Sequence, residues 1–578
     1  MRTVHIIFPL FRGARQFKIE KGRRWSVIEH IVLQALTARP RTAKDIAEAG
    51  ALPRRMVVEA ITRLMQAGWV ELRSTGSTVV FDATELGRVR SGQDELPRAI
   101  DPKNIWRSFY IDGETGSAFR IRELTTSNRR NLPVSTDEQI VHEVKRRELD
   151  SENLTEIFNA LENQDEFIVG VYPSVSRLVP TFGIVTYRDG VPEGIPSRAP
   201  RSFIDFIQRE YEKIRASEAA LPVAKPQAPS AEVIAKENKS YLFENNDLIL
   251  DGKEHRDGFI KLIKSADKRL LIHSGFVTEN VQGVLPNLLA AAGREVRIDL
   301  FYGQDDDPKG KTSSENAIEF LKKQIAGTGL RERFHIHPFS TESHAKIAIA
   351  DDRQNGWTAL LGSCNWLASG FTSFDATVRV RDPRMVAELV SILARLSKGR
   401  LGVWTETATA LSVLGRQISR IPPRNGRKAE MDLLYTKDHP SLVMDAARAA
   451  RKRIFVLSHQ FGVAGRPVTI FPLMDVAKST EVAVSAFYGK PAGKKTAAEL
   501  LDLRERYGEA HLQLRSIERP RLHAKVLGWD DDNLAVTSFN WLSVDPSPHK
   551  PLREVGLLIK SNQIAEKFLR DFDLAQWN

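Results

Sequence analysis

The first regular pattern of hydrophobic and polar positions lies between residues 25 and 92. Hydrophobic residues recur at helical spacing in 25–37, 42–49 and 52–67, with Thr42 as an N-cap and Pro53 at a helix start. Alternating segments at 69–73 and 78–83 follow, joined by "STGS". This pattern predicts three helices and a β-hairpin.

This order of elements resembles a winged helix-turn-helix domain, which we place at residues 1–100. The predicted third helix carries Arg54, Arg55 and Arg63. The first hundred residues hold 17 Lys and Arg against 10 Asp and Glu. We therefore predict DNA contact through these three arginines. A module for protein–protein or interdomain contact is the alternative, because no base-reading residue can be identified.

Beyond this region the pattern changes twice before it begins to repeat. Residues 101–221 mix strand-like and amphipathic segments and predict an α/β or α+β domain of unknown role, and the Pro- and Ala-rich residues 222–238 predict a linker. The rest of the chain contains an internal repeat. An earlier segment, "ADKRLLIHSGF", resembles a later one, "ARKRIFVLSHQF", and in the same way "EVRIDLFYGQ" resembles "EVAVSAFYGK". We place two duplicated α/β halves at 239–417 and 418–578, each with a mixed sheet.

Each half contains the same unusual motif on a predicted buried strand. "HAKIAIAD" (344–351) and "HAKVLGWD" (523–530) share the spacing H-x-K-x4-D, and "GSCNW" and "TSFNW" follow them. Residues i and i+2 of a strand share a face, so a His and a Lys stand side by side there. This arrangement is costly on an apolar strand unless an anion binds to it.

The paired motifs resemble those of the phospholipase D superfamily over roughly residues 240–578. The resemblance implies two α/β halves packed as a pseudo-dimer, with one active site at the seam. It implies phosphodiester cleavage through a phosphohistidine, with no metal and no cofactor. The implied catalytic residues are His344, Lys346, Asn365, His523, Lys525 and Asn540.

The resemblance also suggests a role for each residue. We take His344 as nucleophile and His523 as general acid, although the sequence treats the two almost symmetrically. The lysines and asparagines would hold phosphoryl oxygens, and Ser363 and Ser538 would add hydroxyl contacts. Asp375 and Glu554 match the position that orients a catalytic histidine. The motif aspartates, Asp351 and Asp530, point to the opposite strand face and serve structure.

Two departures from the usual pattern concern spacing and one side chain. Thr537 stands where a glycine is usual, and the gap from Asp351 to Gly362 is longer than common. Neither removes a reactive group. We expect Trp366 and Trp541 to pack under the site. His273 and His459 occupy similar places in the repeats, either at the border of the site or as satisfied core residues.

Composition narrows the class of partner. The net charge is +11 and the pI about 9.5, which favours anionic partners. The single cysteine, Cys364, allows no internal disulfide and fits a reducing compartment. No apolar run is long enough to cross a membrane, so we expect a cytoplasmic protein without membrane contact.

These features favour a nuclease acting on DNA, in a setting such as bacterial defence or repair. The chain has no nucleotide-binding motif, so a helicase or ATPase is a conceivable partner. The oligomeric state is left open. A phospholipase D or phosphatidyltransferase acting on phospholipids is the first alternative, and a non-catalytic DNA-binding regulator is the second.

Overall fold

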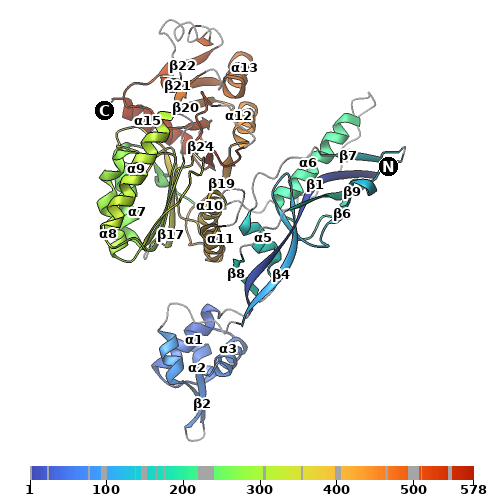
Figure 1. The fold of residues 1–578 in the computed structure, drawn as a ribbon, viewed down its shortest axis with the longest axis vertical. Coiled ribbons are helices and arrows are strands. Elements are labelled where there is room, and N and C mark those ends of the chain that lie inside the picture. The colour runs from blue at the N-terminus through green and yellow to red at the C-terminus, as the bar shows by residue number, and fades with distance from the viewer. Residues whose placement is uncertain are drawn as a thin grey trace.

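The structure is a computed structural model, drawn as a ribbon in Figure 1. It describes residues 3–21, 25–75, 78–92, 101–136, 138–144, 153–163, 166–172, 178–218, 240–303, 308–352, 356–397, 405–462, 466–492, 505, 507–508, 511–544 and 550–577. The predicted linker at 222–238 lies outside these residues.

The first strand, β1 (Thr3–Lys21), belongs to the sheet of the middle domain. It pairs antiparallel with β4 (Asp101–Asp112), from Lys21 opposite Asp101 to Leu10 opposite Asp112. The boundary predicted at 1–100 is therefore wrong, because the first strand pairs with segments that follow the helical unit in sequence. Residues 25–92 are an insertion at the tip of the β1–β4 hairpin, and Figure 1 shows them apart from the repeated halves.

The middle domain is a mainly antiparallel sheet packed on helices. Its strand order is β10-β9-β1-β4-β5, with β6 on β9 and with β7 and β8 on β1. Phe8 of β1 packs edge-on against Phe203, with ring centroids 5.3 Å apart. The other elements are β5 (Ala118–Arg120), β6 (Thr125–Ser127), β7 (Gln139–Glu143), α5 (Leu154–Leu161), β8 (Glu166–Val171), β9 (Val179–Arg188), β10 (Val191–Glu193) and α6 (Arg201–Glu218).

The inserted unit contains the three helices and the hairpin that the sequence predicts. Ser26 and Thr42 cap the first two helices, each in a capping box with the acidic residue three positions later. A further helix, α4, was not predicted. The elements are α1 (Val27–Ala38), α2 (Ala43–Ala49), α3 (Arg54–Gln66), β2 (Val70–Thr75), β3 (Thr78–Ala83) and α4 (Glu85–Ser91).

The first repeated half is a seven-stranded sheet with the order β12-β18-β17-β16-β13-β14-β15. Its strands are β12 (Leu248–Ile249), β13 (Ala266–Ser274), β14 (Arg297–Tyr302), β15 (Phe334–Ile336), β16 (Ile347–Asp352), β17 (Gly356–Gly362) and β18 (Thr377–Val380). Its helices are α7 (Gly252–Ser265), α8 (Leu285–Gly293), α9 (Pro308–Ala326) and α10 (Pro383–Leu396).

The second half repeats this topology, which confirms the duplication. The order β18-β17-β16-β13-β14-β15 corresponds strand by strand to β25-β24-β23-β20-β21-β22. Its strands are β19 (Lys428–Tyr435), β20 (Arg453–Phe461), β21 (Ala483–Pro491), β22 (Leu512–Ser516), β23 (Val526–Trp529), β24 (Asn533–Thr537) and β25 (Val555–Lys560). Its helices are α12 (Asp438–Ala449), α13 (Phe471–Ser479) and α15 (Ile564–Trp577).

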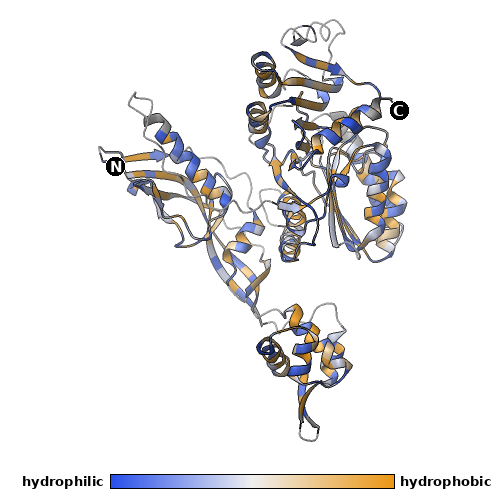
Figure 2. Cartoon of the chain, turned by 180° about the vertical axis from the view of Figure 1, so that it is seen from behind, coloured by the Kyte–Doolittle hydropathy of each residue, from blue (hydrophilic) through white to orange (hydrophobic). Residues whose placement is uncertain are grey.

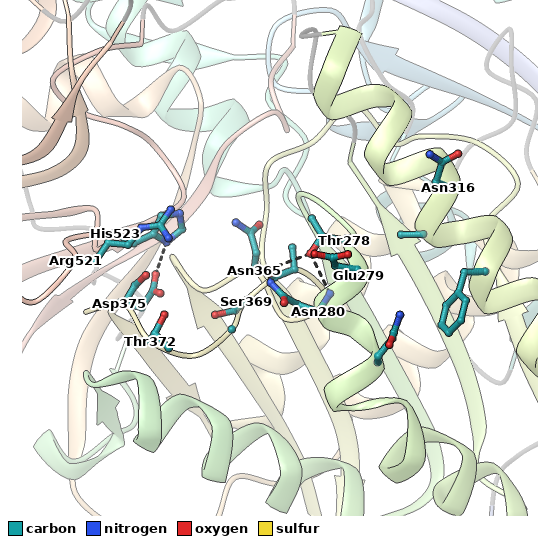
Figure 3. A pocket seen from close by; sticks show the side chains of 16 residues that line it. Thr278, Glu279, Asn280, Asn316, Asn365, Ser369, Thr372, Asp375, Arg521 and His523 are labelled. Atoms are coloured by element: carbon teal, nitrogen blue, oxygen red, sulfur yellow. Dashed lines mark hydrogen bonds and ion pairs between the residues drawn. The ribbon is translucent and has the colours of Figure 1, made fainter.

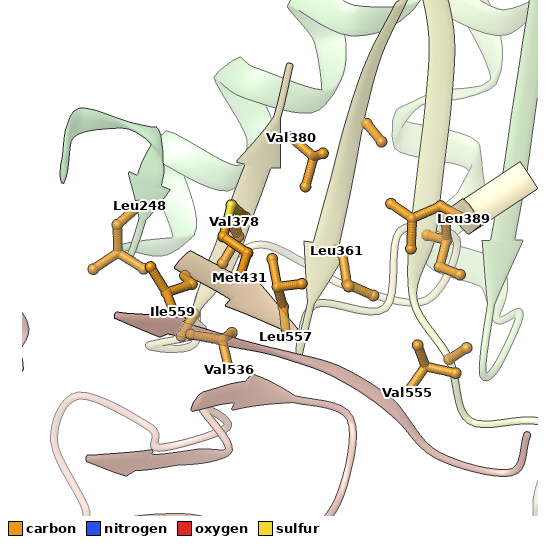
Figure 4. Packing of buried hydrophobic residues seen from close by; sticks show 14 of the residues in the cluster. Leu248, Leu361, Val378, Val380, Leu389, Met431, Val536, Val555, Leu557 and Ile559 are labelled. Atoms are coloured by element: carbon orange, nitrogen blue, oxygen red, sulfur yellow. The ribbon is translucent and has the colours of Figure 1, made fainter. Parts of the chain in front are cut away.

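One hydrophobic core joins the two sheets at the seam. Leu361 and Val378 of the first half and Val536 and Leu557 of the second belong to the same buried cluster (Figure 4). Each fully buried side chain of this kind stabilises the fold by about 1.5–3 kcal/mol. The strands of both sheets are apolar along much of their length, whereas hydrophobic and hydrophilic residues alternate along the covering helices (Figure 2). The halves therefore form one pseudo-dimer.

The predicted boundaries of the halves need two corrections. β11 (Ser240–Leu242) precedes the first half in sequence but pairs with β19 in the second sheet. The predicted cut at 417 falls inside α11 (Glu406–Ser419). This helix also attaches the middle domain, because the buried guanidinium of Arg416 pairs with Glu162. In the part of the chain that is described, no helix is both long and apolar enough to cross a bilayer.

Candidate active site

Both H-x-K segments lie just before a strand rather than inside it, because β16 and β23 begin one residue after each lysine. The expected strand placement is therefore wrong. Their backbones are held by the opposite half: the N–H of His344 donates to Arg553 O at 2.6 Å, and that of His523 donates to Phe374 O at 2.9 Å. Both segments therefore lie along the seam.

Each motif histidine is paired with a buried carboxylate from the other half. His344 Nδ1 lies 3.0 Å from Glu554 Oε1, and His523 Nδ1 lies 2.6 Å from Asp375 Oδ1. An ionised carboxylate only accepts, so each Nδ1 carries the proton and donates it. This fixes the tautomer and leaves both Nε2 atoms available for chemistry.

The serines of the segments "GSCNW" and "TSFNW" orient these carboxylates. Ser363 Oγ donates to Asp375 Oδ1 at 2.6 Å, and Ser538 Oγ donates to Glu554 Oε2 at 2.5 Å. Contact with phosphoryl oxygens was the expected role, and the structure corrects it. Both hydroxyls are fully buried and already donate to a carboxylate.

The pairing also sets the charge of the partners. Burial opposes ionisation of Asp375, but the charge and hydrogen bond of His523 outweigh it and lower the pKa of Asp375. Burial likewise opposes ionisation of Glu554, and His344 and its hydrogen bond lower that pKa. Burial lowers the pKa of His523, and Asp375 counteracts part of this effect.

Two buried lysines stand close to the histidines. Lys525 Nζ donates to His523 O at 2.7 Å, and Lys346 Nζ donates to His344 O. Burial and the charge of Lys346 lower the pKa of Lys525 to about 7. A bound anion would relieve both effects, as expected for a site that receives a phosphate.

The asparagines and one glycine complete this arrangement. Among the described residues, Asn365 Oδ1 and Asn540 Oδ1 are buried without a hydrogen-bond partner. A Cβ on Gly275 would lie 2.9 Å from Lys346 Nζ and 3.1 Å from Asn365 Oδ1. Gly275 therefore leaves room for the lysine and asparagine at the cleft.

The unusual Thr537 is compensated across the sheet. It lies opposite Gly556, whereas in the first half Gly362 lies opposite Thr377. A Cβ on Gly556 would lie 2.6 Å from the Thr537 side chain, and one on Gly362 would lie 2.6 Å from Thr377 Oγ1. Threonine and glycine have thus exchanged strands. In both halves the threonine hydroxyl bonds a buried histidine, His255 or His439.

The motif aspartates serve structure, as predicted. Asp351 accepts backbone N–H groups of residues 267–269, and Asp530 accepts those of residues 451–453. Each carboxylate ties the strand that follows its H-x-K segment to the start of the neighbouring strand.

His273 and His459 are not equivalent, contrary to expectation. His273 is buried and bonds Ala345 O at 2.7 Å and Thr341 Oγ1 at 2.8 Å. His459 takes the place of Gly275, as the matching hydrogen bonds of the preceding serines show. Its ring lies 4.7 Å from that of His523, so a third imidazole adjoins the second motif histidine.

Trp366 and Trp541 pack beneath the site, as predicted. Both are fully buried, and their ring centroids lie 5.0 Å from those of Phe259 and His439, respectively. They support the loops that carry the motif asparagines.

A cavity of about 900 Å³ opens beside His523 (Figure 3). Arg521 lies alongside His523 in this view, and Glu279 and Asn280 lie across the cavity. The sequence analysis missed these residues, and only the position of Arg521, two residues before His523, offered a local signal. The described residues contain no group of three His, Cys, Asp or Glu side chains that could hold one metal ion.

The three arginines proposed for DNA contact do not share one environment. Arg54 and Arg55 are exposed at the start of α3, in the inserted unit. Arg63 instead pairs with the buried Glu29 at 2.9 Å and with Glu59. The predicted DNA contact of Arg63 is therefore wrong. Two glutamates already neutralise its charge, and these ion pairs stabilise the inserted unit.

Comparison with protein families and solved structures adds independent information. Residues 259–397 match the family described as "Cardiolipin synthase, PLD-like domain". This part of the chain thus matches a phospholipase D-like domain. The second half repeats the topology and the motifs of the first. No curated protein matches the sequence.

Three solved structures each resemble part of this chain. Phosphatidylserine synthase from Haemophilus influenzae Rd KW20 is 13% identical, over 58% of this chain and 87% of its own, with a TM-score of 0.41. The phospholipase D family member Nuc from Salmonella typhimurium is 20% identical, over 25% and 93%, with a TM-score of 0.21. Yeast tyrosyl-DNA phosphodiesterase is 12% identical, over 52% and 84%, with a TM-score of 0.33. All three are distant in sequence from this chain.

The buried histidine beside the site makes stability depend on pH. Burial lowers the pKa of His273 from 6.5 to about 3, so between these values the unfolded chain holds a proton that the folded chain lacks. Stability therefore falls as the pH falls through this window. We expect His273→Gln to reduce the slope of unfolding free energy against pH by about 1.4 kcal/mol per unit.

Urea denaturation of the full chain between about pH 6 and pH 4 measures this slope. His511→Asn, at an exposed histidine, is the control and should keep the wild-type slope. An unchanged slope in His273→Gln would contradict a neutral His273 in the fold.

Proposed function

We propose that the protein is a metal-independent phosphodiesterase that cleaves DNA, with His344 as nucleophile and His523 as general acid and base. The crosswise pairs of the two histidines with Glu554 and Asp375 carry this proposal. They hold both imidazoles at one seam in the tautomer that exposes Nε2.

In the first step, His344 Nε2 attacks the phosphorus. A P–N bond forms while the P–O bond to the leaving group breaks, and His523 gives its Nε2 proton to the departing oxygen. The two buried lysines and the amides of Asn365 and Asn540 stabilise charge on the non-bridging oxygens.

In the second step, water replaces histidine on phosphorus. His523, now neutral, takes a proton from the water, whose oxygen forms the new P–O bond as the P–N bond breaks. His344 leaves as a neutral imidazole, its Nδ1 proton still held by Glu554. The product is a phosphate monoester, and both histidines return to their starting protonation states.

DNA is favoured over phospholipid by charge and by the lining of the cleft. The chain carries a net charge of +11. Half of the residues that line the cavity beside His523 have amide or hydroxyl side chains, and few are apolar and able to receive acyl chains. The inserted unit presents Arg54 and Arg55 at a helix start, where a phosphate backbone would bind.

Changing either histidine should abolish cleavage without preventing binding. In EDTA, we expect His344→Ala and His523→Ala to slow DNA cleavage by about 10³-fold or more, because each removes a group that bonds or transfers a proton in the reaction. His511→Asn is the control. Plasmid, single-stranded DNA, RNA and phospholipid vesicles form the substrate panel.

The panel separates the rival functions. Head-group release from vesicles with intact nucleic acid would contradict the DNA assignment. Binding of DNA without turnover of any substrate would indicate a non-catalytic regulator. Substantial activity in both single variants would rule out a shared site.

The pH–rate profile tests which histidine is the acid. The charge of Asp375 raises the pKa of His523, so Asp375→Asn should lower the pKa of His523. Rates fall on the alkaline side as the acid loses its proton, so this limb should move to lower pH, with kcat reduced by about 10²-fold or more.

Glu554→Gln is the matched variant, because it removes the carboxylate charge beside His344 as Asp375→Asn removes the one beside His523. It should leave the alkaline limb in place, because His523 keeps its own carboxylate partner. Movement of the acid limb in Asp375→Asn would reverse the two roles.

The inserted unit should contribute to DNA affinity through two phosphate contacts. We expect Arg54→Ala/Arg55→Ala to reduce the slope of log K against log salt concentration by about 2. Fluorescence anisotropy with duplex DNA measures this slope. Arg209→Ala/Arg215→Ala on α6 removes the same charge elsewhere, and an equal effect in that control would contradict a specific role for α3.

A further inference from the structure

Equivalent positions beside the two motif histidines differ in charge, although the halves share one topology. Glu342 and Arg521 occupy equivalent positions, two residues before each motif histidine. Glu342 Oε2 lies 2.9 Å from Lys550 Nζ, so the charge at that position is neutralised. The side chain of Arg521 has no hydrogen bond or ion pair to the described residues and is exposed.

Arg521 is nevertheless held in a defined place. Its carbonyl accepts the backbone N–H of Phe374 at 2.9 Å, in the loop that leads into Asp375. This bond fixes the backbone of Arg521 beside the cavity, and Figure 3 shows its side chain next to His523. A guanidinium with no partner among the described residues thus lies beside the histidine that would face the scissile phosphate.

The remaining walls of the cavity offer groups that recognise a nucleoside. Asn280 and Asn316 carry amides, which can donate to and accept from a base edge, and Phe320 is a partly buried ring on which a base can stack. Glu279 lies across the cavity from Arg521 (Figure 3). The negative charge of Glu279 disfavours a phosphate there, but its carboxylate can accept a hydrogen bond from an exocyclic amino group of a base.

We infer that this cavity binds the nucleotide adjoining the scissile phosphate on the side of His523, with the next phosphate on Arg521 and the base towards Glu279 and Asn280. The inference rests on the proposed function. Because His523 protonates the leaving oxygen, this nucleotide is the first one of the departing strand. A guanidinium can bind its phosphate in a bidentate manner, which the ion pair at the equivalent position cannot do.

Two substrates separate this role from catalysis itself. Bis(p-nitrophenyl) phosphate has a scissile phosphodiester but no neighbouring phosphate or base, whereas a short homodeoxycytidine oligonucleotide has both. We expect Arg521→Ala to lower kcat/KM on the oligonucleotide about 10- to 100-fold more than on bis(p-nitrophenyl) phosphate. Lys550→Ala, beside the equivalent position, is the matched control and should show no such difference.

A second readout uses the substrate. In the wild type, a single neutral methylphosphonate next to the cut site should suppress that cut by a similar factor. In Arg521→Ala the same substitution should have little further effect, because both changes remove one contact.

The outcomes distinguish this inference from the proposal beneath it. Equal losses on both substrates, or additive effects of Arg521→Ala and the methylphosphonate, overturn the role of Arg521 while DNA cleavage stands. A wild type that hydrolyses neither substrate overturns the proposed function, and this inference with it.

Discussion

The site depends on a crosswise exchange of carboxylates between the halves. Glu554 of the second half holds His344 of the first, and Asp375 of the first holds His523 of the second. Neither half can therefore set the tautomer of its own histidine. The shared hydrophobic core at the seam brings the partners within hydrogen-bond distance, so packing and chemistry rest on the same interface.

This exchange also explains how so many ionisable groups are kept buried. Two lysines and two carboxylates are buried at the seam beside two half-buried imidazoles, and isolated charges there would be costly. Each carboxylate has an imidazole and a serine hydroxyl as partners, so its charge is compensated. The lysines are less well compensated, as the lowered pKa of Lys525 shows, and a phosphate would supply the missing negative charge.

Features that repeat locally could be predicted from the sequence, and long-range contacts could not. The motifs, the duplication and the three helices were visible because each is contained in a short segment. The pairing of β1 with β4, the carboxylate partners of Ser363 and Ser538, and the ion pair of Arg63 all join residues distant in sequence or depend on side-chain direction. Arg521 belongs to no motif, and apart from its place two residues before His523 only its position beside the cavity, with no partner among the described residues, singles it out.

The central claim is that the two motif histidines form one site, and counting covalent intermediates tests it most directly. Full-length protein is mixed with labelled DNA in EDTA, quenched in alkali, and its phosphohistidines are located by peptide mapping. A single site predicts no more than one labelled histidine per chain, at His344, and none in His344→Ala. Labels on both His344 and His523 of the same chain would show two independent sites and contradict the account.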